Sequence, residues 1–179
     1  MTKLKKVIEL TDGTIIIKPF QEEDAEEHLR GEDSEQIKWL NGGCKSTVDS
    51  VRNWIKRNRK SREKGGPVFN FAIRTLEDGK LIGMVEAGID FEIIEGIKEG
   101  DANISYGLYP AARGKGYAAR AVILMVSFLK AKGLKQAIIR SEPENPGSLK
   151  VPERCGFTRT GQIVTGSGGE LIIFEKKLQ

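Results

Sequence analysis

The sequence DANISYGLYPAARGKGYAARAVILMVSFLKAKG, residues 101–133, carries the strongest structural signal in the chain. Residues 104–109 alternate between large apolar side chains and small or polar ones, which predicts a strand that ends at Pro110. Residues 116–132 carry apolar side chains at helical spacings, which predicts a helix with one apolar face. Gly133 follows where a left-handed C-terminal cap is expected. The residues at these spacings, which form the apolar face, are Ala118, Ala121, Val122, Met125, Phe128 and Leu129.

Between the strand and the helix lies the loop RGKGYA, residues 113–118. Gly114 and Gly116 have no Cβ, so the backbone can turn sharply and aim successive N–H groups into one concavity at the positive end of the helix. Lys115 and Arg113 add full charges, and an Arg guanidinium can bind two phosphate oxygens at once. We therefore expect a phosphate or diphosphate on the amides of residues 114–118.

Two known phosphate-binding loops fit this sequence poorly. A Walker-type loop needs a Gly five residues before Gly114 and a Ser or Thr after Lys115, and the chain has Tyr109 and Gly116 there. A dinucleotide-binding fingerprint is matched by Gly114, Gly116 and Ala119. That fold opens with its fingerprint and then adds several parallel strands, whereas this chain ends soon after the helix.

A third pattern, R-x-x-G-x-A, is satisfied by Arg113, Gly116 and Ala118. Farther along, NPGSLKVPERCGF at 145–157 supplies an N-x-x-S segment that ends in Gly-Phe. Together these motifs resemble the GNAT superfamily of N-acetyltransferases, and the pattern is most similar to the Rim-type ribosomal-protein N-terminal acetyltransferases. The resemblance implies an α/β (α+β) GNAT fold, with a mixed central sheet of about seven strands, a splayed parallel pair and about four flanking helices.

The rest of the chain fits that fold in one domain over residues 1–179, in the order β-α-α-β-β-β-α-β-α-β-β. We expect strands over 14–19, 68–75, 80–91, 104–109, 135–141, 157–164 and 171–178. We expect helices over 22–30, 48–63, 116–132 and 146–155, and a loop over 31–47. Trp39 and Trp54 are expected in the core, with the lining of an acceptor pocket as the alternative for one of them.

Composition favours a soluble protein in a reducing compartment. The 179 residues are 39% hydrophobic and 30% charged, with a formal net charge of +4. No stretch is long and apolar enough to span a membrane, and the start MTKLKKVIELTDG lacks the apolar segment of a secretory signal. Cys44 and Cys155 have no metal or redox spacing, so we expect no metal and a cytoplasmic location.

The resemblance implies acetyl-CoA as the cosubstrate. In that reading the backbones of Tyr106 and Leu108 hydrogen-bond the pantetheine and the thioester, and the Leu108 N–H stabilises the oxyanion. The expected cofactor-binding residues are Tyr106, Leu108, Arg113, Gly114, Lys115, Gly116, Tyr117, Ala118 and Asn145.

Glu86 is the first candidate for a catalytic residue. It stands in the middle of the strand 80–91, on a face that also carries Ile82 and Met84. A carboxylate there is either a paired structural charge or a group whose pKa is raised by burial, which would suit a general base. Asp90 and Glu142 are weaker candidates for the same role.

Ser148 is the second candidate, as the proton donor to the departing thiolate. Many members of the superfamily place a Tyr seven residues after the motif Asn, but here that position is Pro152. Ser148 occupies the position three after Asn145, as in the Rim-type enzymes. The structural alternative is that Asn145 and Pro146 simply begin a helix, with Ser148 in its first turn. Pro152 would also free the Ser148 carbonyl and distort that helix.

These residues predict an N-acetyltransferase that moves an acetyl group from acetyl-CoA directly to a primary amine, either a protein or peptide N-terminus or a small cationic amine. A non-catalytic CoA-binding regulatory domain is one alternative. Another is a ribosome- or nucleic-acid-associated protein that uses the basic run RNWIKRNRKSREK at 52–64, although no motif for direct base readout is present. A solvated helix face also accounts for that run. The sequence indicates no membrane partner and leaves the oligomeric state open, a homodimer included.

Overall fold

Within residues 8–179, which the computed structural model describes, eight strands form one mixed sheet. The strand order is β1-β2-β3-β4-β5-β6-β8-β7, and every neighbouring pair is antiparallel except β5 and β6. The sheet thus has one strand more than expected, because the two-residue β1 pairs with β2. The strands are β1 Leu10–Thr11, β2 Ile15–Lys18, β3 Val68–Thr75, β4 Leu81–Gly88, β5 Asp101–Leu108, β6 Gln136–Ser141, β7 Thr158–Val164 and β8 Glu170–Lys177.

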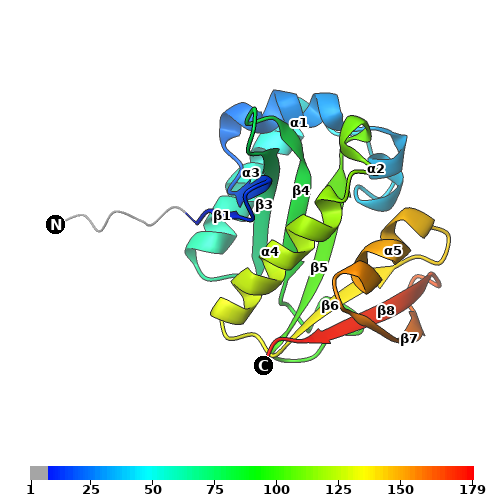
Figure 1. Cartoon of the computed structure of the whole chain (residues 1–179). Coiled ribbons are helices and arrows are strands. Elements are labelled where there is room, and N and C mark those ends of the chain that lie inside the picture. Colours follow the sequence, from blue (N-terminus) through cyan, green and yellow to red (C-terminus); the bar gives the residue numbers. More distant parts are fainter. Residues whose placement is uncertain (1–7) are drawn as a thin grey trace.

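Helices cover both faces of this sheet (Figure 1). The α4 helix crosses one face, and α5 lies in front of β6 and β8, while α1 and α3 pack on the opposite face against β3 and β4. Five α-helices are present in the described residues, one more than expected. They are α1 Ala25–Gly31, α2 Ser34–Trp39, α3 Val48–Glu63, α4 Tyr117–Ala131 and α5 Pro146–Arg154, with short 3-10 turns at Glu22–Asp24 and Pro110–Ala112.

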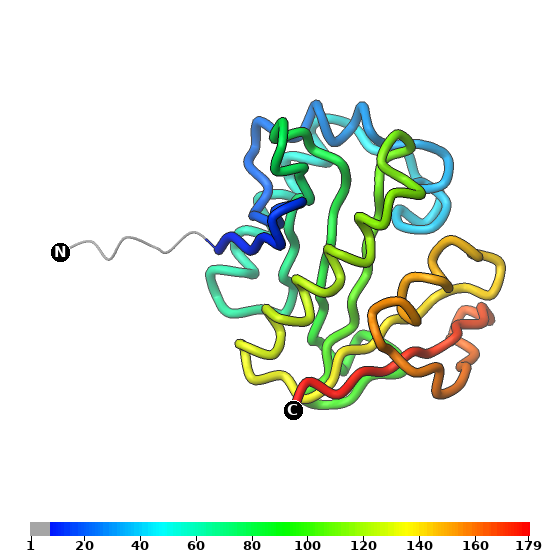
Figure 2. Tube along the Cα trace, viewed as in Figure 1, coloured from blue at the N-terminus to red at the C-terminus, as the bar shows by residue number. Residues whose placement is uncertain are grey.

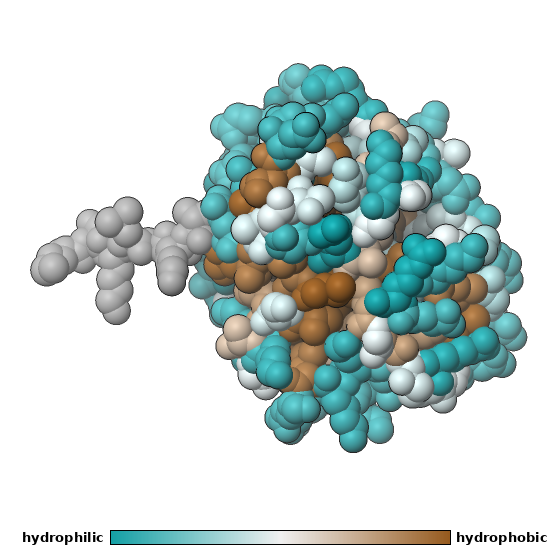
Figure 3. All heavy atoms as spheres, viewed as in Figure 1, coloured by the Kyte–Doolittle hydropathy of each residue, from teal (hydrophilic) through white to brown (hydrophobic). Residues whose placement is uncertain are grey.

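The main core lies between α4 and the sheet, as the apolar spacing predicted. Phe128 of α4 meets Phe69 and Phe71 of β3 edge to face, with ring centroids 5.2 Å apart in both pairs. Each large apolar side chain buried in this way contributes roughly 1.5–3 kcal/mol. Gly133 ends the helix with φ of 81°, the predicted left-handed cap. Figure 3 shows apolar atoms in the middle of this face, surrounded by hydrophilic ones.

The face assignment within β4 was partly wrong. Ile82 was expected beside Met84 and Glu86, but it is buried in the main core with Val85. The pairing of β3 with β4 shifts between Ile73 and Arg74, which leaves Ile82 as an extra residue in β4. This β-bulge turns Ile82 to the other face, because one extra residue reverses the alternation.

The basic run forms the exposed side of α3, as the solvated-face interpretation predicted. Lys56 and Arg59 pair with Glu22, and Arg52 pairs with Glu26, at the surface. Such exposed pairs stabilise a protein little. The apolar side of α3 packs against β3 and β4 and forms with them a second apolar cluster. Half-buried Trp54 belongs to this second cluster.

The parallel pair β5–β6 separates along its length. The two strands pair only from Asp101–Gln136 to Asn103–Ile138, although β5 continues to Leu108 and β6 to Ser141. In Figure 2 the green trace of β5 and the yellow trace of β6 diverge from their meeting point. The splayed parallel pair is therefore confirmed.

The described part of the chain has no helix that is both long and apolar enough to span a membrane. The assignment of residues 1–179 to one domain stays a prediction. The lysine-rich start of the chain, residues 1–7, lies outside the described residues.

Candidate active site

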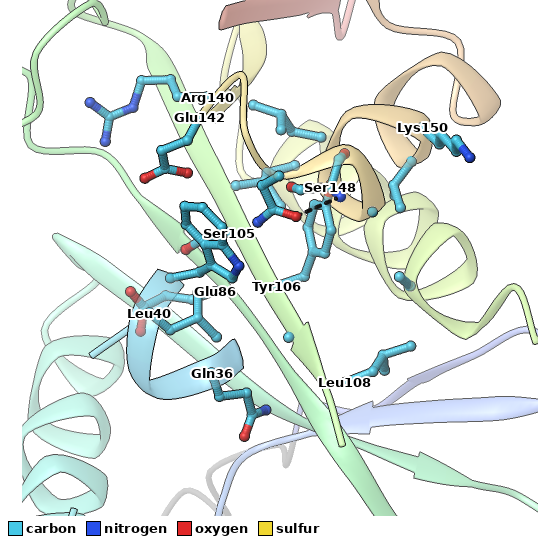
Figure 4. Close-up of a pocket in the computed structure, with 18 of the residues that line it drawn as sticks. Gln36, Leu40, Glu86, Ser105, Tyr106, Leu108, Arg140, Glu142, Ser148 and Lys150 are labelled. Carbon is cyan, nitrogen blue, oxygen red and sulfur yellow. Dashed lines mark hydrogen bonds between the residues drawn. The ribbon is translucent and has the colours of Figure 1, made fainter. Parts of the chain in front are cut away.

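A cavity of about 960 Å³ occupies the opening between β5 and β6. Its floor is the backbone of β5 from Asn103 to Leu108. Its walls come from the loop over residues 113–118, which we call the glycine loop, from α2 and from the first turns of α5. Figure 4 shows Tyr106 and Ser148 meeting on one side of β5 and Glu86, Leu40 and Gln36 gathered on the other. The splay thus joins the predicted phosphate loop to the predicted catalytic residues in one space.

The glycine loop offers free amides to this cavity. Gly114 and Gly116 have φ of 75° and 79°, and a Cβ on either would meet nothing within 4 Å. Among the backbone hydrogen bonds outside regular helices and strands in residues 8–179, none is donated by an amide of residues 114–118. The first turn of a helix has no internal acceptors for its N–H groups. These amides can therefore bind an anion, at the positive end of α4.

The side chain of Arg113 is hydrogen-bonded within the protein and does not point freely toward the amides of residues 114–118. Its Nη1 and Nη2 donate to the two carboxylate oxygens of Asp33 at 2.7 and 2.8 Å, and its Nε donates to the Leu108 carbonyl at 3.0 Å. The hydrogen-bonded guanidinium holds the pKa of the Asp33 carboxyl below its usual value. The fork that we expect to bind phosphate is paired here with a carboxylate, because Asp33, the N-cap of α2, lies within its reach. Phosphate binding by Arg113 stays a prediction.

The helix α2 forms a wall of the cavity that the sequence prediction missed. Asp33 caps it by accepting the Gln36 N–H at 3.1 Å, so the ion pair with Arg113 ties α2 to the glycine loop. Trp39 lines the cavity and donates its indole N–H to Glu35 at 2.8 Å. Trp39 thus lines the cavity, whereas Trp54 packs against the core. Contact of Trp39 with the acceptor stays a prediction.

Replacing Asp33 with Ala is expected to loosen α2 and leave the rest of the fold intact. Loss of a helix cap costs about 0.5–2 kcal/mol, and the partly exposed ion pair adds little. Hydrogen exchange of the α2 amides should accelerate, while exchange in α4 stays unchanged.

A matched control is Asp12→Ala, between β1 and β2 at the sheet edge, since Asp12 does not line the cavity. Like Asp33, Asp12 pairs with an arginine, Arg120 at 2.6 Å, and it accepts two backbone amides where Asp33 accepts one. This change should leave exchange in α2 unaltered. Equal protection of α2 in the Asp33 variant and the unchanged protein would show that the Asp33–Arg113 pair does not hold α2.

Glu86 stands in β4 between Asn70 of β3 and Ser105 of β5, each of which is its direct partner in the sheet. The Asn70 amide donates to Glu86 Oε2 at 3.0 Å. Burial raises the pKa of Glu86, and the Asn70 hydrogen bond offsets part of that rise. The residue is thus a hydrogen-bonded structural carboxylate and also a cavity-lining group with the raised pKa of a candidate base.

Ser148 is held by both ends of its backbone. Asn145 accepts its N–H at 3.1 Å, which confirms the helix-capping role of Asn145. The Tyr106 hydroxyl donates to the Ser148 carbonyl at 2.9 Å and lies 3.2 Å from its Oγ. Pro152 lacks the N–H that would bond this carbonyl in a regular helix, so the Tyr106 hydroxyl takes its place. Burial raises the pKa of Tyr106 despite the Ser148 hydrogen bond, which keeps its hydroxyl protonated as the donor.

The sequence prediction missed this use of the Tyr106 side chain. It assigned Tyr106 a backbone role and noted separately that Pro152 would free the Ser148 carbonyl. A freed carbonyl and a half-buried tyrosine on the strand beneath it were the available signals.

Three further carboxylates line the cavity. They are Glu35 from α2 and Glu142 and Glu144 after β6, whereas Asp90 does not line it. Arg140 also lines the cavity, and its guanidinium donates to the Asn103 side chain at 2.9 Å and to the Glu95 carbonyl at 2.7 Å. In the described residues no group of three His, Cys, Asp or Glu side chains could hold a metal ion.

A model of the acetyltransferase (GNAT) domain matches residues 14–158, most of the chain. The protein belongs to the GNAT acetyltransferase family. A search of curated protein sequences found no match.

Solved structures of GNAT proteins have the same fold. An acetyltransferase of the GNAT family from Bacillus anthracis is 22% identical with a TM-score of 0.76, over 96% of this chain and 99% of that one. RimJ from Mycobacterium smegmatis, in complex with CoA-disulfide, is 19% identical with a TM-score of 0.76, over 96% and 86%. The aminoglycoside acetyltransferase AAC(6')-Ib, in complex with coenzyme A, is 17% identical with a TM-score of 0.75, over 92% and 95%.

Most of the site residues expected from the sequence line this cavity. Lys115 and Tyr117 do not line it, since the Lys115 side chain is exposed and Tyr117 packs against the main core. For these two residues the backbone amides are the groups available to a ligand. The predicted residues that line the cavity are Glu86, Tyr106, Leu108, Arg113, Gly114, Gly116, Ala118, Asn145 and Ser148.

Proposed function

We propose that this GNAT protein is an N-acetyltransferase that moves the acetyl group of acetyl-CoA directly to a primary amine. The observation that carries the proposal is that Gly114 and Gly116, from the loop that we expect to bind phosphate, line the same cavity as Glu86 and Ser148. Structures of GNAT relatives with CoA-disulfide and with coenzyme A support the choice of cosubstrate. The acceptor is a protein or peptide N-terminus or a small cationic amine.

The donor would lie along β5. Its diphosphate would accept hydrogen bonds from the amides of residues 114–118, at the N-terminus of α4. Beyond Asn103 the edge of β5 no longer pairs with β6, so the pantetheine amides can bond to its backbone as an added strand would. Tyr106 and Leu108 would supply those backbone groups, and the Leu108 N–H would stabilise the oxyanion.

The amine would enter from the face of the sheet on which Glu86 of β4 and Ser105 of β5 lie. An amine attacks a thioester only when it is neutral, and an α-amino group with pKa of about 7.7–8.0 is already partly neutral at pH 7. Glu86, directly or through a water, would accept the proton that the attacking nitrogen releases. The glutamates at 35, 142 and 144, which line the cavity, would attract a cationic acceptor to it.

Ser148 would hand its hydroxyl proton to the sulfur of the thiolate that leaves and would take a proton from a water molecule in the same step, so that it stays neutral. Ser148→Ala is therefore expected to lower kcat roughly 10- to 100-fold, at or below the lower end of general-acid contributions, because water can replace the hydroxyl. Measurement of kcat against the true acceptor tests this role.

The control is Tyr106→Phe, which removes the hydroxyl that positions the Ser148 backbone and keeps the Ser148 Oγ. Its kcat should fall less than that of Ser148→Ala. An unchanged kcat in Ser148→Ala would reject Ser148 as the proton donor.

The proposal as a whole is tested by thiol release from acetyl-CoA over a panel of amines: peptides with free N-termini, aminoglycosides and polyamines. At least one class should produce amine-dependent thiol release. Saturable binding of CoA without release from any amine would instead favour a non-catalytic CoA-binding domain.

A further inference from the structure

Gln36 of α2 is a buried polar residue whose side-chain nitrogen has no partner among residues 8–179. The residue is 6% exposed, it lines the cavity, and its Nε2 is buried with no hydrogen-bond partner in the described part of the chain. Its backbone is satisfied, since the N–H is bonded to Asp33. Buried polar groups are normally hydrogen-bonded, and an orphaned one points to a missing partner.

The position of Gln36 is fixed by its neighbours. A Cβ added to Gly107 would lie 3.3 Å from Gln36 Nε2 and 2.5 Å from Leu40 Cδ1, so α2 rests directly on β5 at this glycine. In Figure 4 Gln36 and Leu40 extend from α2 next to β5. The amide is therefore held in place on the face of β5 where the amine would bind.

Gln36 and Glu86 lie over neighbouring positions on that face. Glu86 is opposite Ser105 in the sheet, and Gly107, beneath Gln36, is two residues further along β5. The step from Ser105 to Gly107 spans roughly 6.6–6.8 Å. A short N–C–C–O segment with a hydrogen bond of about 2.9 Å at each end has the reach for a step of this size.

We propose that Gln36 is a specificity-determining residue that donates a hydrogen bond to an oxygen of the acceptor, and that it selects amines with a carbonyl on the adjacent carbon over plain alkyl amines. The inference rests on the proposed function and narrows its acceptor. An α-amino amide presents its nitrogen to Glu86 and its carbonyl oxygen to Gln36. An alkyl polyamine carries only amines, which are protonated donors at pH 7 and leave Nε2 without an acceptor.

The test measures the acetylation of two small amines of equal chain length, glycine methylamide and n-butylamine. Each amine is given to the protein without a substitution, to Gln36→Met and to Leu40→Met. Met matches Gln in shape and removes its amide, and Leu40→Met is a volume-conserving change on the same wall. For each protein we take the ratio of kcat/KM for glycine methylamide to kcat/KM for n-butylamine. Comparing this ratio between variants cancels the different basicities of the two amines.

Unchanged protein should prefer glycine methylamide. Gln36→Met should lower kcat/KM for glycine methylamide roughly 10- to 100-fold, the cost of one lost hydrogen bond in a buried site, and leave n-butylamine unchanged. Leu40→Met should change both amines alike. An equal loss with both amines in Gln36→Met, or no loss with either, would overturn the proposal.

A second readout separates this proposal from the proposed function. In the CoA-loaded protein the NMR signals of the Gln36 side-chain amide should shift on addition of glycine methylamide and not of n-butylamine. Such a shift without turnover of any amine would support the Gln36 subsite and contradict the transferase. Turnover of both amines without the shift and without a preference would contradict the subsite alone.

Discussion

Replacement of Gly116 with Asp is expected to weaken CoA binding at least about 100-fold. Gly116 precedes α4 in the left-handed conformation, which Asp tolerates better than most residues, and a Cβ there meets open space. The new carboxylate would lie where we place the diphosphate. Two like charges about 4 Å apart near a protein surface repel by about 4 kcal/mol. Because the loop is partly exposed, solvent screens part of this repulsion. A loss of affinity of about 100-fold corresponds to about 2.7 kcal/mol, which the screened repulsion can supply.

Two controls separate charge from backbone strain. Gly116→Asn has the same shape without the charge and should retain most of the affinity. Gly133→Asp makes the same change at the other end of α4, also at positive φ and with nothing within 4 Å of the added Cβ, and should bind CoA normally. Calorimetric titration with CoA measures all three variants. Equal affinity of the Asp and Asn variants at position 116 would exclude this loop as the diphosphate site.

Glu86→Gln is expected to lower kcat about 10²- to 10⁴-fold, the usual contribution of a general base, with CoA affinity unchanged. The same change should stabilise the protein at neutral pH. Burial raises the pKa of Glu86, so between the unfolded and folded pKa values the folded chain binds more protons than the unfolded one. Stability therefore falls as the pH rises through that range, and the neutral Gln removes the loss.

Thermal unfolding at two pH values checks the sign. Glu86→Gln should raise Tm at pH 7 and not below the unfolded pKa of about 4.3, where the carboxyl is protonated in both states. Asn70→Leu is the companion variant. It removes the hydrogen bond that lowers the pKa of Glu86, so the acid limb of kcat/KM should move to higher pH. Full activity in Glu86→Gln would leave Glu86 as a structural carboxylate.

The periodic elements could be predicted from the sequence because their burial pattern is local. The apolar spacing of α4 and α3, and the caps at Asn145 and Gly133, are written in neighbouring residues, and all were found where expected. Helix α2 has only six residues, too few for a periodic pattern to stand out, and it is held by the distant Arg113.

The side-chain partnerships of the site depend on contacts between remote segments. Asp33 and Arg113 are 80 residues apart, and Tyr106 and Ser148 are 42 apart. The motif located Arg113 but could not reveal that a carboxylate from α2 binds its fork. Likewise the bulge at Ile82 depends on how β3 and β4 register, which an alternating pattern cannot show. The unpartnered Nε2 of Gln36 can likewise be recognised only in the fold, because it depends on which groups of the described residues surround the side chain.

Direct acetyl transfer to an amine in the cavity between β5 and β6 can be measured by thiol release coupled to mass spectrometry of the acceptor, with Gly116→Asp as the blank. We expect amine-dependent release of CoA with one acetylated amine per thiol, and loss of that release in the blank. Release equal in both proteins, or none with any peptide, aminoglycoside or polyamine, would refute direct transfer in this cavity.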